Sequence, residues 1–274
     1  MVYKKEKYMK KTIALFALLT STLSFGEEDT YFRAWQGFIN PKLTTEKFFQ
    51  ELPSFMEDTV RIYEGRALVN YIVVIPPKDK PAFIPDELAL VALTNKEDYL
   101  AIRNTPEGQH YSARHWDVFN KDNSKSADPM IDFKAELPAT LIHNQSYNVL
   151  GKSIDWQEGY NLVYIGLRKK HLSAEDFLKK LRNHISLFAS TMSPKGLKGY
   201  IVIANNDYEV AYLNWESKRA HDEAFMTALG KIAVKDGGSI LDNLMYEEAK
   251  AHRVSINGKV ETGKAYSTMP ASSK

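Results

Sequence analysis

The chain contains two segments with the same pattern, and this internal repeat constrains its fold more than any other feature. "GFINPKLTTEKFF" begins at Gly37, and "GLRKKHLSAEDFL" begins at Gly166, an offset of 129. The same offset relates the β-rich run "YIVV" at Tyr71 to "YIVI" at Tyr200. A self-match over this length without an insertion indicates two copies of one structural unit.

Each copy predicts the element order β-α-β-β-α-β. An aromatic-rich strand pattern comes first, followed by a helix pattern with apolar residues three and four positions apart. A second strand, a third strand that leads into a helix, and a β-like stretch containing Gly-Lys complete each copy. The strands expected at the start, middle and end of the copies are residues 31–39, 66–75 and 141–152, and residues 160–168, 197–204 and 252–259.

This order is that of the ferredoxin-like split βαβ unit, in which helices cover one face of a four-stranded antiparallel sheet. The other face of each sheet is apolar here and must be covered. We therefore expect an α+β protein of two ferredoxin-like units, residues 27–156 and 157–274, packed sheet to sheet as an intramolecular α/β barrel. Such a chain would be a monomer with an internal pseudo-dimer, with further oligomers left open.

Residues 1–26 have the pattern of a secretory signal peptide. Lysines precede a short apolar run, and Ser24-Phe25-Gly26 places small residues at the expected cleavage site. The run is too short to span a bilayer comfortably, although a retained anchor is the alternative. The pattern predicts a periplasmic or secreted protein with no membrane attachment after cleavage, and leaves open whether Met1 or Met9 starts the chain.

Charge and cysteine content exclude several classes of function. The formal net charge of +2 belongs to the leader, because residues 1–26 carry five Lys and one Glu. The remaining chain is slightly acidic, which argues against a nucleic-acid partner. The chain has no cysteine, so it has no thiol nucleophile and no Cys-based metal site. It also lacks the G-x-S-x-G, H-E-x-x-H, P-loop and G-x-G-x-x-G motifs.

The repeated order and the passage "YLNWESKRAHDEAF" from Tyr212 resemble the dimeric α/β-barrel superfamily, in particular its antibiotic-biosynthesis-monooxygenase-like group. Here the two units would be tandem copies in one chain. The resemblance implies a cofactor-independent oxygenase, a haem-degrading enzyme, a haem-binding chlorite-converting enzyme or a protein without a known reaction. Haem is thus the one cofactor that it suggests.

The same resemblance points to candidate site residues in the second copy. Haem-degrading relatives use an Asn, a Trp and a His near the pocket between sheet and helices. Trp215 and His221 are the candidate catalytic residues, and Asn161 and Asn214 are candidate ligand-binding residues. We expect Trp215 and His221 to line one pocket with the strand at residues 160–167. The alternative is a packing Trp at a strand end and a surface His in a charged helical turn.

Two further histidines are candidates. His115 lies in "GQHYSARHWDVF", where dense polar aromatics can line a ligand pocket or pack against one another. The spacing of His110 and His115 is not the i,i+4 spacing of two metal ligands on one helix face, so no metal site is predicted. His184 occupies the position of Phe55 in the other copy, where a hydrogen-bonded core histidine is more common than a ligand.

Two hypotheses of function follow. One is a small oxygenase or haem-handling enzyme with its pocket in the second copy. The other is a non-catalytic module that binds a small apolar or aromatic molecule. Because the copies differ most at the third strand and the helix after it, we expect at most one working pocket.

Overall fold

The computed structural model describes residues 30–63, 65–132, 137–151 and 154–249. The predicted signal peptide and the strand expected at residues 252–259 lie outside these ranges. None of the described helices is long and apolar enough to cross a membrane.

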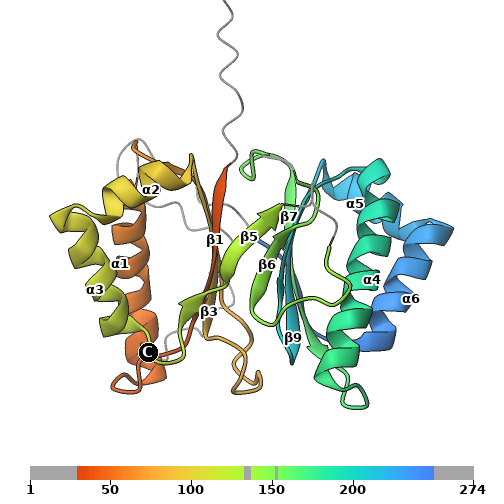
Figure 1. Cartoon of the computed structure of the whole chain (residues 1–274), viewed down its shortest axis with the longest axis horizontal. Coiled ribbons are helices and arrows are strands. Elements are labelled where there is room, and N and C mark those ends of the chain that lie inside the picture. Colours follow the sequence, from red (N-terminus) through yellow and green to blue (C-terminus); the bar gives the residue numbers. More distant parts are fainter. Residues whose placement is uncertain (1–29, 64, 133–136, 152–153, 250–274) are drawn as a thin grey trace, which may run out of the picture.

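Two successive sets of strands and helices make up the described chain (Figure 1). The first set is β1 (Tyr31–Gly37), α1 (Thr45–Tyr63), β2 (Leu68–Val74), β3 (Glu87–Leu93), α2 (Lys96–Arg103), α3 (Pro106–Val118) and β4 (Lys125–Ser126). Two connecting strands follow, β5 (Asp128–Asp132) and β6 (Gln145–Asn148). The second set is β7 (Tyr160–Arg168), α4 (Ala174–Met192), η1 (Ser193–Lys195), β8 (Leu197–Ala204), β9 (Tyr208–Trp215), α5 (Lys218–Met226), α6 (Ala228–Ile240) and β10 (Leu241–Glu248).

The two sheets share one strand order. The first sheet is ordered β2-β3-β1-β4, and the second contains the corresponding run β8-β9-β7-β10. This is the ferredoxin-like arrangement, so the predicted α+β class and ferredoxin-like sheets agree with the structure. The second sheet is longer, because β6 pairs antiparallel with β8 and β5 pairs parallel with β6.

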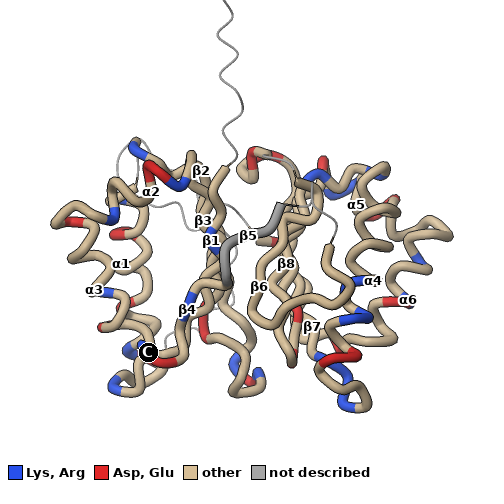
Figure 2. The backbone as a smooth tube through the Cα atoms, viewed as in Figure 1, with Lys and Arg blue, Asp and Glu red and all other residues tan. Residues whose placement is uncertain are grey.

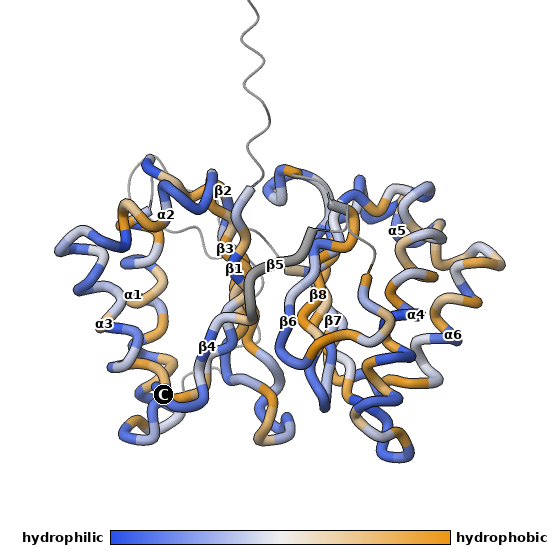
Figure 3. Tube along the Cα trace, viewed as in Figure 1, coloured by the Kyte–Doolittle hydropathy of each residue, from blue (hydrophilic) through white to orange (hydrophobic). Residues whose placement is uncertain are grey.

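The sheets face each other, and the helices lie on the two outer sides (Figure 1). Strand alternation sends Ile72, Leu90 and Val163 into a core between the sheets. It sends Tyr71 and Tyr200 to the outer faces, against the helices of their own units. Hydrophobic residues accordingly run along the central strands (Figure 3), while acidic and basic residues are intermixed over loops and helices (Figure 2).

One continuous stretch of chain belongs to both sheets. β4 pairs with β1, and the Ala127 amide donates to the Ala34 carbonyl at 2.8 Å. The chain then continues as β5 at the edge of the second sheet. At the opposite edges, β2 pairs only with β3 and β10 only with β7 among the described strands, so these strands do not close into a barrel.

The closing strands differ from the sequence prediction. We expected residues 141–152 to complete the first unit, but β6 in that range pairs with β8 of the second sheet. The first unit is instead completed by the two-residue strand β4, and the second by β10, directly after α6. The prediction relied on the Gly-Lys that ends residues 141–152, whereas the pairing of β6 depends on which edge of a sheet is free to accept a strand.

Strand register gives the spatial equivalence of the two units. Glu87 pairs with Gly37 in the first sheet, and Glu209 pairs with Gly166 in the second. The offset is therefore 129 for the first strands but 122 for the third. The helices keep the second offset, since the caps of α2 and α5 are Asn95 and Ser217 and those of α3 and α6 are Thr105 and Thr227. Leu93 at the end of the third strand of the first unit therefore occupies the position of Trp215 in the second.

Candidate functional site

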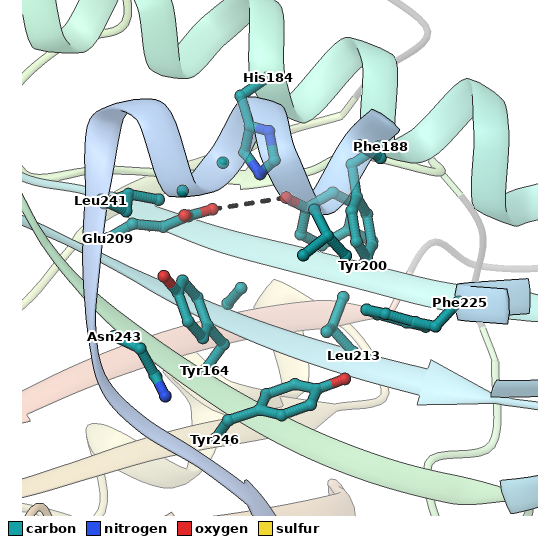
Figure 4. Close-up of a pocket in the computed structure, with 15 residues that line it drawn as sticks. Tyr164, His184, Phe188, Tyr200, Glu209, Leu213, Phe225, Leu241, Asn243 and Tyr246 are labelled. Carbon is teal, nitrogen blue, oxygen red and sulfur yellow. Dashed lines mark hydrogen bonds between the residues drawn. The ribbon is translucent and has the colours of Figure 1, made fainter. Parts of the chain in front are cut away.

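A cavity of about 410 Å³ lies between the outer face of the second sheet and helices α4 and α6. Its wall is mostly apolar and aromatic, which is typical of a small-molecule site. Polar groups enter it from every layer: His184 from α4, Tyr200 from β8, Glu209 from β9, and Tyr164 and Tyr246 from the neighbouring strands. Figure 4 shows these side chains around one space.

Small residues create the room for this cavity. On α6, Ala233, Gly237 and Gly238 form part of its wall and project little or no side chain into it. On β7, a Cβ at Gly166 would lie 2.6 Å from the Tyr164 hydroxyl, so glycine lets that phenol lie along the strand. The cavity therefore depends on small residues, which a pattern of hydrophobic residues does not reveal.

His184 is held in one orientation by Asp236 of α6. Its Nδ1 lies 3.0 Å from Asp236 Oδ2, and a carboxylate can only accept, so Nδ1 carries the hydrogen. Nε2 is then the acceptor atom, and it has no hydrogen-bond partner among the described residues. Burial lowers the pKa of His184 and the Asp236 contact opposes this, so the ring is neutral near neutral pH. The result is an oriented base beside an apolar cavity.

Glu209 is fully buried in the strand and faces the same cavity. Burial raises its pKa to about 8, and the hydrogen bond from Tyr200 opposes the rise. The Tyr200 hydroxyl lies 3.4 Å from Glu209 Oε1, as the dashed line in Figure 4 marks. At neutral pH this carboxyl is mostly protonated, so it places a neutral hydrogen-bonding group in the wall.

Trp215 and His221 come together beside the cavity. Their rings meet edge to face at 5.2 Å, and Phe225 lies 4.5 Å from the imidazole. Neither lines the cavity, although Phe225 and Tyr246, which touch His221, both do. The prediction that Trp215 and His221 line a pocket with the strand at residues 160–167 is therefore wrong for this cavity: Tyr164 of that strand is in its wall, and Trp215 contacts the wall residue Phe225.

Asn161 and Asn214 lie on the other face of the sheet. They pair across β7 and β9, and the Asn214 side-chain amide donates to Asn161 Oδ1 at 2.7 Å. Their remaining bonds run to the carbonyls of Trp156 and Glu158 in the preceding loop. Because neighbouring strand residues alternate between faces, a residue next to Trp215 cannot share its side. These amides fix the loop and are not in the cavity wall.

His115 is buried in the first unit, at the place that Gly237 occupies in the second. Burial lowers its pKa to about 4, and its Nδ1 bonds the Tyr111 carbonyl at 3.1 Å. Tyr111 occupies the place of Ala233, and Phe55 that of His184. These rings fill the space under α3, where a cavity of only about 40 Å³ remains. The first unit thus contains the same scaffold with its cavity filled.

Sequence reasoning did not select Glu209, Tyr164, Tyr200, Tyr246 or Asp236, and it favoured a core role for His184 over a ligand role. One signal was present for the glutamate. Both "DELALVAL" and "YEVAYL" carry an acid at the same place in an otherwise buried strand. Acids are rarely buried without a partner or a function, so such an acid marks a candidate site.

No protein-family model matches the sequence, and no curated protein sequence matches it. Solved structures with a similar overall arrangement include a proposed monooxygenase from Lactobacillus acidophilus, with a TM-score of 0.42, 12% identity, and coverage of 86% of this chain and 97% of that one. A proposed monooxygenase from Fusobacterium nucleatum matches with a TM-score of 0.47 and 11% identity, over 86% of this chain and 95% of that one. An anthrone oxidase-like protein matches with a TM-score of 0.41 and 13% identity, over 83% of this chain and 93% of that one.

Proposed function

We propose that this protein binds a small, flat, mostly apolar molecule with one acidic hydroxyl group in the second-unit cavity, and that it removes the hydroxyl proton. One observation carries the proposal: Nε2 of His184, oriented by Asp236, lies in the same apolar cavity as the Glu209–Tyr200 pair. The equivalent place in the first unit retains only about 40 Å³, so of these two equivalent places it is the one in the second unit that has the space for a ligand.

The shape of the cavity favours a flat ligand. Phe188, Phe225 and the tyrosine rings provide aromatic faces and edges, which pack well against a planar body. A volume of about 410 Å³ is near the lower end of the range for small-molecule sites, about 300–1,000 Å³. The size therefore fits a molecule of a few fused rings or fewer.

The electrostatics favour removal of a proton. His184 is a neutral, pre-oriented base, and the imidazolium formed by proton transfer would remain paired with Asp236. Glu209 is mostly protonated at neutral pH because burial raises its pKa to about 8, so it does not repel the anion that forms. No Lys or Arg lines the cavity among the described residues, so the imidazolium would be the positive partner of that anion.

This chemistry supports an oxygenase more than a haem protein. Ionisation makes an aromatic hydroxyl compound more electron-rich, which is the condition for its direct reaction with oxygen. Haem fits the cavity poorly: its carboxylates would find no cation in the described wall, and the buried carboxyl of Glu209 would face the macrocycle. We therefore derive no step through haem. Binding without turnover is the rival function, and it would use the same cavity.

The test uses 4-nitrophenol, because its ionised form absorbs visible light and its neutral form does not. At a pH below the pKa of the free phenol, the wild-type protein should bind it and produce the phenolate absorbance. His184→Phe, which copies Phe55 of the first unit, should reduce the ionised fraction at least tenfold. His110→Gln, an exposed histidine of the first unit, is the matched control and should change nothing.

Two results would contradict the proposal: no binding by the wild-type protein, or an unchanged phenolate signal in His184→Phe. Oxygen uptake with a panel of hydroxylated polycyclic aromatics then separates the two functions. Uptake that depends on His184 favours the oxygenase, and binding without uptake favours the binding module.

We also propose that the chain is exported and that its two units arose by tandem duplication into a pseudo-dimer. The leader pattern of residues 1–26 supports export, and the shared strand order supports duplication. N-terminal sequencing of protein from its host checks the first idea. A mature start near Glu27 is expected, and retention of the apolar run would indicate an anchor.

A further inference from the structure

We infer that Tyr246 and His221 form a proton relay that connects the second-unit cavity to solvent, on a different wall from His184. The inference rests on the proposed function, because it concerns a second route by which a hydroxyl compound bound in the cavity can release its proton. The relay explains why His221, which does not line the cavity, is hydrogen-bonded to a residue that does.

The contacts form a continuous chain from the cavity to the surface. Tyr246 lines the cavity, and its hydroxyl lies 2.6 Å from Nε2 of His221. Nδ1 of His221 lies 2.8 Å from Asp222 Oδ1, and Asp222 is half exposed at the surface. Lys218 donates to the other carboxylate oxygen at 2.5 Å. Each link is within the distance that proton transfer requires.

The direction of these hydrogen bonds follows from their chemistry. Asp222 can only accept while it is ionised, and the hydrogen bond from Lys218 lowers its pKa and keeps it so. Nδ1 of His221 therefore carries the hydrogen, and Nε2 accepts from the Tyr246 hydroxyl. The Tyr246 oxygen then has lone pairs left to accept a hydrogen bond from a ligand in the cavity.

A proton can pass along this chain with all atoms accounted for. When the ligand hydroxyl lies at Tyr246 and not at His184, its O–H bond breaks as an O–H bond forms on Tyr246, and Tyr246 gives its own proton to Nε2 of His221. The resulting imidazolium is stabilised by Asp222 and releases a proton to water at the surface. The ligand has lost one proton, water has gained one, and no other reactant is consumed.

The orientation of His221 is built by packing and is not that of a free surface side chain. Its ring is only 13% exposed, although it lies on a charged helical turn. Trp215, Phe225 and Tyr160 surround the imidazole at centroid distances of 5.2, 4.5 and 5.7 Å. This packing fixes the direction of Nε2 toward Tyr246, so Trp215 is a positioning residue.

The relay and His184 approach the cavity from opposite sides. In Figure 4, His184 descends from α4 next to Glu209 and Tyr200, whereas the Tyr246 ring crosses the far side of the space toward Phe225. His184 is the base that its Asp236 contact prepares. Tyr246 is the first group of the relay through which the occupied cavity exchanges protons with solvent.

The experiment measures how fast bound 4-nitrophenol changes its ionisation after a pH jump, by stopped-flow absorbance on the full-length protein. The dissociation rate of the probe is measured separately by displacement, so that only relaxation faster than dissociation is assigned to the bound state. In His221→Gln we expect at least a tenfold slower relaxation and an affinity within about twofold of wild type, since His221 does not line the cavity.

Tyr246→Phe should slow relaxation similarly, and His110→Gln serves as the unaffected control. Added imidazole should restore the rate in His221→Gln, because a mobile base can take the proton from Tyr246; a purely structural role would show no rescue. Unchanged relaxation in both variants, with normal binding, would overturn the relay alone. Absence of binding to the wild-type protein would overturn the proposed function and the relay with it.

Discussion

Glu209→Gln should make the protein more stable at alkaline pH. The carboxyl of Glu209 is fully buried, and burial raises its pKa from 4.5 to about 8. Between these two values the unfolded chain has lost the proton while the folded chain retains it. Folding therefore takes up a proton, and the stability of the wild-type protein falls as pH rises through this window.

The magnitude follows from the size of the shift. One pH unit corresponds to about 1.4 kcal/mol for one linked proton, so the window from 4.5 to 8 amounts to roughly 5 kcal/mol. A glutamine cannot ionise and resembles the protonated acid in shape. The variant should match the wild type near pH 5 and exceed its free energy of unfolding by several kcal/mol at pH 8.

Urea unfolding followed by circular dichroism, at pH values from 5 to 8, measures this difference. Other titrating groups cancel when the variant is compared with the wild type at each pH. Glu87→Gln in the first unit is an independent second test with the same expected result, because burial also raises the pKa of Glu87 to about 8 and the residue occupies the equivalent position. A difference that does not grow with pH would refute the argument for either carboxyl.

Three further predictions concern the cavity and the shared core. Gly238→Ala should stabilise α6 by up to about 1 kcal/mol, since nothing lies within 4 Å of the new Cβ. Gly237→Ala should not give this stabilisation, because its Cβ would lie 2.8 Å from the His184 ring. Thermal melts of both variants measure the difference. Ala233→Tyr, which copies Tyr111, should fill the cavity and weaken 4-nitrophenol binding at least tenfold in a titration, and unchanged affinity would mean that the probe binds elsewhere. Residues 27–156 expressed alone should aggregate or dimerise, because their sheet leaves Ile72 and Leu90 uncovered, and light scattering that shows a folded monomer would contradict this.

Much of the fold could be predicted from the repeat. The offset between Tyr71 and Tyr200 identifies equivalent strands, and apolar residues three and four positions apart identify α1 and α4. The closing strands could not be predicted, because β4 has only two residues and β6 pairs with a strand of the other unit. Edge pairing is decided by tertiary contacts, which local sequence does not encode.

The site was harder to predict than the fold. A pattern of apolar residues shows what fills a core, but the cavity exists because Ala233 and Gly237 leave part of it unfilled. The offset changes from 129 at the first strands to 122 at the third strands, so a comparison at one fixed offset hides the equivalence of Glu87 and Glu209. Face alternation also separated Asn161 and Asn214 from Trp215, which only the register reveals.

The strand that runs from β4 into β5 makes the assembly of the two sheets independent of dilution. Two separate ferredoxin-like subunits with the same core would part as their concentration fell, because their association is bimolecular. Here a single peptide stretch through Ala127 holds one sheet beside the other, so each meets its partner at a local concentration set by the chain. The two units are consequently free to differ, since neither must recognise a copy of itself, and one can keep its interior full while the other keeps a cavity.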